Sequence, residues 1–186
     1  MLIKIVLVLA VVVVGFLAFV ATRPSAFHIE RSARIAAPPA VVFAQVNDFH
    51  RWEGWSPWAK MDPAMKTTYS GAPAGEGAAY AWVGNSQVGE GKMTITGSKP
   101  TDHIVVRLEF LKPMAATNTA TFTFTPAAGG TDVTWAMDGN NGFVAKGFSV
   151  VVNMDKMLGA YFDQGLAAMK TVAESERQAP RAVGES

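Results

Sequence analysis

The three histidines are the first residues to consider for chemistry, because histidine serves as a general base and as a common metal ligand. His28, His50 and His103 lie far apart in the sequence, with no spacing that would bring two of them onto one face as metal ligands. Only His50 has several charged neighbours, namely Asp48, Arg51 and Glu53. The same cluster is also typical of a capped helix with a solvated face. We therefore keep His50 as the weak catalytic candidate and predict no metal site and no cofactor.

The remaining composition excludes several kinds of chemistry. The chain has no cysteine, which rules out disulfides, thiolate catalysis and cysteine-based metal sites. Its glycine-rich segment, residues 71–77, lacks the Lys-Ser or Lys-Thr ending and the following helix of a phosphate-binding loop. The 16 Lys and Arg are balanced by 15 Asp and Glu, so nothing indicates a nucleic-acid partner.

Residues 35–60 are expected to organise the rest of the chain. Pro38 and Pro39 end an extended segment and suit the first turn of a helix, where a missing N–H costs nothing. A second short helix is expected to follow, together with three tryptophans, Trp52, Trp55 and Trp58. So much aromatic area is unsuited to a solvated loop. We expect it to cover an apolar surface, which could be the sheet of the folded domain, the rim of a ligand cavity or the edge of a bilayer.

The segment between residues 66 and 139 has the alternation of apolar and polar side chains that is typical of strands with one buried face. Glycine, proline and asparagine separate its periodic runs. The predicted strands are residues 27–36, 66–71, 78–83, 88–99, 102–112, 117–126 and 131–138. One face of this antiparallel sheet is apolar and needs a cover.

The C-terminal region supplies that cover as a long helix. Apolar or small residues recur there at helical spacing, at Met154, Leu158, Tyr161, Gly165, Met169 and Val172. Glycine costs a helix interior about 1 kcal/mol relative to alanine, so Gly165 indicates a need for space. Either the close approach of a strand or an adjacent ligand would explain it.

These features together resemble those of a known superfamily. The resemblance covers residues 27–174 and rests on the Ala37-Pro38 corner, the short helix pair with its tryptophans, and further matches at Gly89-Glu90-Gly91, Leu108-Glu109-Phe110, Phe122-Thr123-Phe124, Gly130 to Trp135 and Gly165 to Lys170. The chain is similar to the polyketide cyclase/dehydrase and lipid-transport superfamily, also called START-like or SRPBCC. The resemblance implies an α+β helix-grip fold, in which a curved antiparallel sheet of about seven strands wraps around a long C-terminal helix.

The resemblance also implies a ligand cavity between the sheet and that helix. Aromatic side chains and methionines suit the walls of a pocket for a hydrophobic or lipid-like molecule. The candidate ligand-binding residues are Trp55, Tyr80, Trp82, Met93, Phe110, Phe124, Trp135, Met137, Met154, Leu158 and Phe162. Taken singly, each of them is more simply an ordinary core residue, but a fold that encloses a cavity must line it with some of them.

Three functions remain open from the sequence. The first is a binding protein for a hydrophobic small molecule or lipid. The second is a cyclase, dehydratase-like or hydrolytic enzyme that uses the same cavity with an acid or base from His50, Asp48 or Tyr80. The third is a membrane-tethered protein-interaction module with a collapsed pocket. Converging buried ionisable groups would favour the enzyme, a dry apolar cavity the binder, and a filled interior the module.

The chain begins with an apolar segment that predicts a membrane anchor. Residues 2–21 are apolar except for Lys4 and would span about 30 Å as a helix, the thickness of a bilayer core. A cleaved signal peptide is the alternative, but the run is long and lacks a good small-x-small cleavage site. We predict a single-pass anchor and linker over residues 1–26, a ligand-binding domain over 27–175 and a disordered tail over 176–186.

The side of the membrane is harder to predict. The amino terminus and Lys4 flank one side of the apolar segment, while Arg23, Arg31 and Arg34 flank the other, so a simple count of positive charges opposes export. Arg31 and Arg34, however, fall in the first predicted strand. We expect an extracytoplasmic domain, because a single N-terminal anchor commonly delivers its domain outward.

Overall fold

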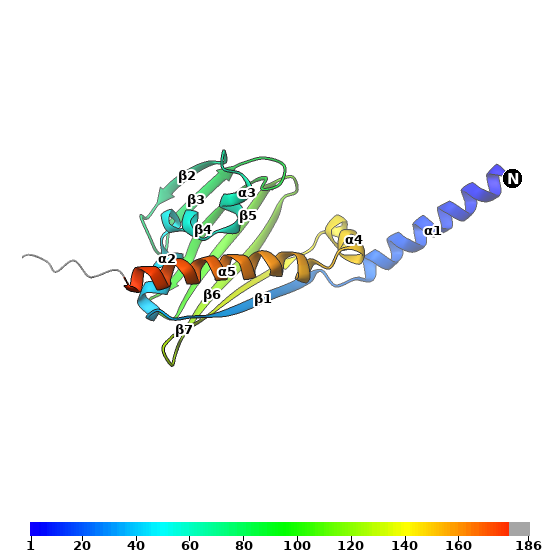
Figure 1. Ribbon diagram of the computed structural model, residues 1–186. Helices are drawn as coiled ribbons and strands as arrows, with labels where there is room; N and C mark the ends of the chain where they lie inside the picture. The colour runs from blue at the N-terminus through cyan, green and yellow to red at the C-terminus, as the bar shows by residue number, and fades with distance from the viewer. Residues whose placement is uncertain (179–186) are drawn as a thin grey trace, which may run out of the picture.

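The computed structural model describes residues 1–178 as a seven-stranded sheet with helices on one face and one helix extending away from the domain (Figure 1). In chain order the elements are α1 (Leu2–Thr22), β1 (Ala26–Ile35), α2 (Pro39–Asn47), the 3-10 helix η1 (Phe49–Gly54), α3 (Pro57–Met61), β2 (Lys66–Gly71), β3 (Ala78–Val83), β4 (Glu90–Lys99), β5 (His103–Lys112), β6 (Ala116–Ala127), β7 (Gly130–Asn140), α4 (Phe143–Val151) and α5 (Met154–Gln178).

The sheet is antiparallel throughout, and its strand order is β1-β7-β6-β5-β4-β3-β2. Apart from the first strand, which pairs with the last, neighbours in the sheet are neighbours in sequence. The α+β class, the seven strands and the long C-terminal helix are therefore confirmed. Every predicted strand is present, with ends that differ by no more than two residues.

Helix α5 lies across the concave face of the sheet and packs mainly on β1, while α2, η1 and α3 cover the remainder (Figure 1). The buried side of α5 is turned slightly from the predicted stripe. Gly165 and Met169 are buried as expected, but Leu158, Tyr161 and Val172 are only half-buried. Phe162 and Leu166 reach the core instead, at 0% and 1% exposure.

Strand register defines two ends of the sheet. Ala26 pairs with Asn140, Glu90 with Lys112, and Val83 with Glu90, so these residues share the end from which α1 departs. We call this the anchor-side end. The β6–β7 turn between Ala127 and Gly130 lies at the opposite end. Helix α4, which the sequence analysis did not predict, follows β7 at the anchor-side end and lies beside the base of α1 (Figure 1).

The end of α5 is fixed to the corner between β1 and α2. Glu174 accepts a hydrogen bond from the backbone N–H of Ala36 at 2.7 Å, and Arg177 donates to the carbonyl of Ala36 at 2.6 Å. Glu176 accepts from Gln45 at 2.9 Å and pairs with Arg51 at 3.0 Å. Helix α5 therefore continues through residue 178, three residues into the predicted tail, because these contacts hold it. Residues 179–186 of that tail lie outside the described residues.

Helix α1 is the single helix among residues 1–178 that is long and apolar enough to cross a membrane, with a mean hydropathy of 3.1. A signal sequence would pass the same test. Val20 is its one buried residue, so almost all of its apolar surface is left without a protein partner. This is the pattern expected of a helix whose apolar side chains face lipid.

Candidate functional site

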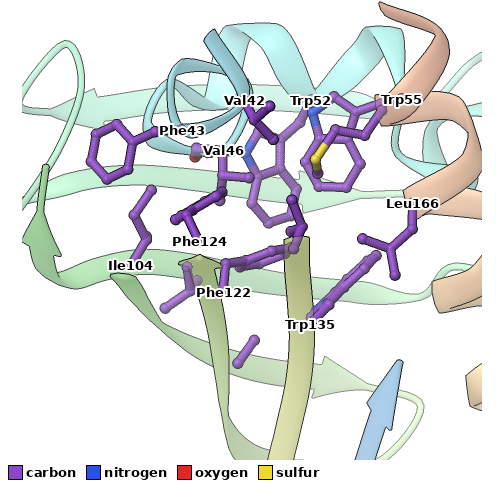
Figure 2. Packing of buried hydrophobic residues seen from close by; sticks show 14 of the residues in the cluster. Val42, Phe43, Val46, Trp52, Trp55, Ile104, Phe122, Phe124, Trp135 and Leu166 are labelled. Atoms are coloured by element: carbon purple, nitrogen blue, oxygen red, sulfur yellow. Dashed lines mark hydrogen bonds between the residues drawn. The ribbon is translucent and has the colours of Figure 1, made fainter. Parts of the chain in front are cut away.

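The concave face of the sheet is the candidate site, because inward side chains from five strands meet α2, η1 and α5 there. Figure 2 shows how these groups converge: Val42 and Val46 of α2 and Trp52 of η1 point toward Phe122 of β6 and Trp135 of β7. The indole of Trp52 donates to the carbonyl of Val46, and that of Trp55 donates to the carbonyl of Gln45, each at 3.0 Å. These bonds let the buried tryptophans keep their polar atoms satisfied.

The alternatives for the tryptophan run are thereby resolved. Trp52 and Trp55 are 6% and 0% exposed, and Trp58 is half-buried. All three pack against other aromatic side chains of the domain, with Trp58 and Trp135 in edge-on contact at 5.7 Å between ring centroids. They pack on the sheet of the domain, which is one of the three alternatives.

Trp135 occupies the space between α5 and the sheet. Its ring stacks on Phe162 of α5 at 4.2 Å between centroids with an interplanar angle of 5°. Phe122 also stacks against the Trp135 ring, at 4.9 Å between centroids, and Trp55 meets the same ring edge-on at 5.7 Å. This cluster closes the interior where the helix-grip architecture would otherwise leave a gap.

Gly165 explains how the cluster fits. A Cβ atom at this position would lie 2.8 Å from Cζ3 of Trp135 and 3.2 Å from Cδ of Pro57. The glycine therefore makes room for the Trp135 ring, rather than for the backbone of a strand or for open space. Hollows in the described chain lie along α1 and beside η1, and neither of these two is between α5 and the sheet.

The predicted ligand-binding residues divide into two groups. Six are buried in the packed interior: Trp55, Trp82, Phe124, Trp135, Met137 and Phe162. Five are half-buried and border solvent: Tyr80, Met93, Phe110, Met154 and Leu158. Phe110, Met93 and Tyr80 lie on neighbouring strands, because Met93 pairs with both Tyr80 and Leu108. The second group is the accessible part of the candidate site.

The chain also accommodates Trp82 by means of a glycine. A Cβ atom on Gly91 would lie 2.4 Å from the Trp82 ring and 2.6 Å from the carbonyl oxygen of Glu109. The indole spreads over this bare backbone and donates to the carbonyl of Val88 at 3.1 Å. Phe110 meets it edge-on at 5.9 Å. The aromatic wall on β3 and β5 therefore depends on the absence of a side chain between them on β4.

Two polar atoms in this apolar face have no hydrogen-bond partner among the described residues, Oδ1 of Asn118 and Nε1 of Trp135. Asn118 is 9% exposed, and its amide nitrogen meets only the sulfur of Met137, at 3.9 Å. Buried polar groups are normally paired, so an unpaired one next to a candidate site is a group that a ligand could satisfy. The sequence analysis missed Asn118, although it is the one amide on the apolar side of β6.

The weak catalytic candidate His50 lies at the solvent-exposed rim of the concave face. Its Nδ1 is 2.9 Å from Oδ1 of Asp48, its ring stacks on Tyr69 at 4.0 Å, and its side chain is 58% exposed. The same Asp48 oxygen accepts from the backbone N–H of His50 and so caps η1. His50 borders an open hollow of about 370 Å³ together with Gln45, Arg51, Glu53, Gly54, Val172 and Glu176.

Tyr80 is the one titratable side chain among the inward residues of β3–β7. Burial raises its pKa to about 12, with smaller contributions from Tyr69 and Glu53. The phenol is therefore neutral at physiological pH and can donate a hydrogen bond, but it is a poor base. The described residues also contain no group of three His, Asp or Glu side chains placed to hold a metal ion.

Arg31 fixes the start of α5 over the sheet, a role that the sequence analysis missed. Its guanidinium donates to both carboxylate oxygens of Asp155 at 3.1 Å and lies 3.6 Å from Asp163. These hydrogen bonds hold the pKa of Asp155 below its usual range. The guanidinium crosses the helix at Gly159, where an added Cβ would lie 2.0 Å from Nη2. Arg31 thus clamps the helix segment that carries Leu158.

Comparisons with solved structures show the same fold at low sequence identity. Protein CV1439 from Chromobacterium violaceum is 14% identical with a TM-score of 0.59, over 79% of this chain and 96% of that one. The di-domain ARO/CYC protein StfQ from the steffimycin biosynthetic pathway is 13% identical with a TM-score of 0.62, over 83% of this chain. The alignment covers 53% of StfQ, about half of its length. A search of curated proteins gives no match.

A family profile decides the classification. The profile described as polyketide cyclase / dehydrase and lipid transport matches residues 26–174, which are the sheet and the helices that pack on it. This is the span over which the sequence resembles that superfamily, and the architecture is that of its helix-grip fold. The chain belongs to the polyketide cyclase / dehydrase and lipid transport family.

Proposed function

We propose that this protein is a membrane-anchored binder of a hydrophobic or lipid-like small molecule. The molecule would lie against the concave face, in contact with Tyr80, Met93, Phe110, Met154 and Leu158. The observation that carries the proposal is the character of this face, which is aromatic and methionine-rich and has a single unpaired amide, that of Asn118. Burial of apolar area would drive binding, at about 25 cal/mol per Å², and the amide would orient the ligand.

The packed interior determines how such a ligand would bind. Because Trp135 and Phe162 fill the space beneath α5, a bulky molecule reaches the six buried residues only if α5 or these rings move. Leu158 and Met154 lie at the start of α5, next to the short α4 and the two-residue link at Val152 and Asn153. Arg31 holds this segment through Asp155, so a shift of the start of α5 would have to break those hydrogen bonds.

The chemistry of the face supports binding over catalysis. Inward positions of β3–β7 carry no carboxylate, lysine or histidine, and the Tyr80 phenol stays protonated. A general acid or base needs a pKa near the working pH. His50 is 58% exposed, stacks on Tyr69 at the rim of the face and contacts Asp48, which caps η1, so no observed contact directs its imidazole at a ligand held against Phe110.

We expect the detergent-solubilised full chain to bind a fluorescent fatty acid, and native mass spectrometry with extraction to detect a co-purified lipid-like molecule. Phe110→Ser should weaken probe binding by up to about tenfold, because complete burial of such a side chain is worth roughly 1.5 to 3 kcal/mol and a ligand buries only the exposed part of Phe110. Val105→Ser is the matched control, since Val105 is a half-buried apolar residue of the same strand whose side chain lies on the opposite face, in regular register with Thr121. It should change the affinity by less than about threefold.

A membrane-tethered interaction module is the competing function, and the packed contact between Trp135 and Phe162 favours it. Absence of probe binding and of any co-purified molecule, in a protein that unfolds cooperatively, would exclude the binder and support the module. Equal loss of binding in the Phe110 and Val105 variants would place the ligand elsewhere.

The proposed orientation is a domain outside the cytoplasm. Arg31 pairs with Asp155 and Arg34 with Asp132, at 3.1 and 2.6 Å, so both charges belong to the folded domain. One basic side chain then flanks each end of α1, Lys4 and Arg23, and the count of positive charges no longer opposes export. Protease added to intact spheroplasts should degrade the domain. Degradation only after lysis would establish the opposite orientation.

A further inference from the structure

Helix α4 is unusual because it is a helix of apolar residues with no buried side chain. Phe143 is 50% exposed, Val144 69%, Phe148 51% and Val151 81%. Exposed apolar clusters of this kind in a folded protein mark contact with another apolar surface. The described domain does not provide that surface.

Other exposed apolar side chains gather at the same end of the domain. Val83 is 54% exposed at the end of β3, Leu111 61% near the end of β5, and Met114 53% in the β5–β6 loop. Strand register places all three positions at the anchor-side end. Beyond residues 1–22 and α4, the other exposed large apolar or aromatic residues among residues 1–178 are Tyr69 on β2, at 37%, and Met157 at the start of α5, at 38%.

The position of α4 identifies the surface that covers it. Val20, near the end of α1, is 1% exposed, and a Cβ on Gly147 would lie 3.9 Å from its Cγ1 atom. Helix α4 therefore packs at the base of the helix that is apolar enough to span a bilayer (Figure 1). If α1 spans the membrane, α4 lies at the level of the lipid headgroups.

We propose that the anchor-side end docks on the bilayer and that α4 lies in the interface with Phe143, Val144, Phe148 and Val151 among the lipids. This inference rests on the proposed membrane anchor. An interfacial helix of this kind buries its apolar face by about 5–10 Å, while basic side chains remain at the headgroups. Lys146 lies in α4, Lys156 is in the first turn of α5, and Arg23 directly follows α1, whose base contacts α4, so all three can serve that purpose.

Docking of this end has a consequence for the ligand. Phe110 and Leu158 of the accessible site lie toward the anchor-side end, since Phe110 pairs with Ala116 at the start of β6 and Leu158 is in the second turn of α5. A lipid-like molecule would then pass between the bilayer and the concave face without crossing open water.

Because the chain has no cysteine, single labels can be attached at chosen positions of the full-length protein. The variants Phe148→Cys and Met114→Cys report on the anchor-side end, and Ala128→Cys, in the exposed β6–β7 turn, is the distal control. Val12→Cys reports on the anchor. Each carries an environment-sensitive dye and is reconstituted in vesicles of phosphatidylcholine and phosphatidylglycerol that contain nitroxide-labelled lipid.

We expect quenching by the nitroxide lipid to be at least about threefold stronger at Phe148→Cys and Met114→Cys than at Ala128→Cys. Adding Val144→Glu to the Met114→Cys protein should reduce its quenching toward the control, because a carboxylate on α4 opposes insertion, and the exposed position leaves the fold intact. Docking would be overturned, while the anchor stands, if quenching at Phe148→Cys is no stronger than at Ala128→Cys and the label at Val12→Cys is shielded from water. The surface that covers α4 would then be a protein partner. An unshielded label at Val12→Cys would instead overturn the anchor itself.

Discussion

Replacing Gly165 with leucine is expected to prevent the domain from folding. The leucine side chain would have to occupy space that is filled by the Trp135 ring and by Pro57, which are 2.8 and 3.2 Å from the nearest possible Cβ position. Trp135 cannot move aside, because Phe162 and Phe122 stack against it and Trp55 meets its edge. Loss of the cooperative urea transition followed by tryptophan fluorescence is the measurement.

Gly165→Ala provides a graded version of the same test. Alanine improves helix propensity by about 1 kcal/mol, but overpacking of a rigid core costs roughly 1 to 3 kcal/mol, so a net loss of stability is expected. Gly147→Ala in α4 is the matched control. Its Cβ would meet only Val20, at an ordinary 3.9 Å, so stability should stay level or rise. A well-folded Gly165→Leu protein would show that the interior has room that the packed rings conceal.

The sequence predicted the fold well because its periodicities are local and unambiguous. Strands β2 and β3 were predicted at their observed bounds, and α5 at its observed start, since alternation, turn residues and helical spacing are all properties of short windows. Helix α4 was not predicted. It is nine residues long and contains a glycine and three valines, which are weak helix formers. None of its residues is buried, so it has no core-facing side that a pattern of polar positions would delimit.

The candidate site was harder to predict because burial depends on how distant elements meet. Trp135 and Phe110 both sit on the apolar face of a strand, yet one is 2% exposed and the other is half-buried. The difference is that α5 packs on β1 and covers β7, while it stays away from β5. The Arg31 clamp on α5 joins residues 124 positions apart, which no local pattern can indicate.

Trp135→Ala is expected to be the most destabilising truncation in the domain. The side chain is 2% exposed and contacts aromatic rings from α3, α5, β6 and the end of η1, so its removal leaves a cavity that rigid neighbours cannot refill. Losses of about 3 to 5 kcal/mol are typical for a buried tryptophan or phenylalanine. Urea denaturation of the detergent-solubilised chain measures the change in the free energy of unfolding, and a loss below about 1 kcal/mol would contradict the packing.

A comparison of two conservative replacements isolates the role of the unpaired indole nitrogen. Trp135→Phe removes part of the ring and so loses packing. It also removes a buried N–H that has no partner among the described residues, and the free-energy cost of burying that group disappears, which partly offsets the loss. Trp55→Phe removes a similar area from a residue that is 0% exposed, but it also breaks the hydrogen bond to the Gln45 carbonyl. Trp55→Phe should therefore be the more damaging by about 1 kcal/mol. The reverse order would show that the Trp135 N–H is satisfied in solution.

The same alanine variant tests where a ligand can be held. If the ligand reaches the interior by displacing the Trp135 ring, then Trp135→Ala removes that cost in advance, and a fluorescent fatty acid should bind several-fold more tightly to the folded variant. If the ligand stays on the accessible residues around Phe110, the affinity should change by less than about threefold, because those residues do not depend on the indole. A folded Trp135→Ala protein that binds the probe more weakly would show that the indole itself is a ligand contact. In that case its unpaired N–H, at the centre of the apolar face, is the group that a polar atom of the ligand satisfies.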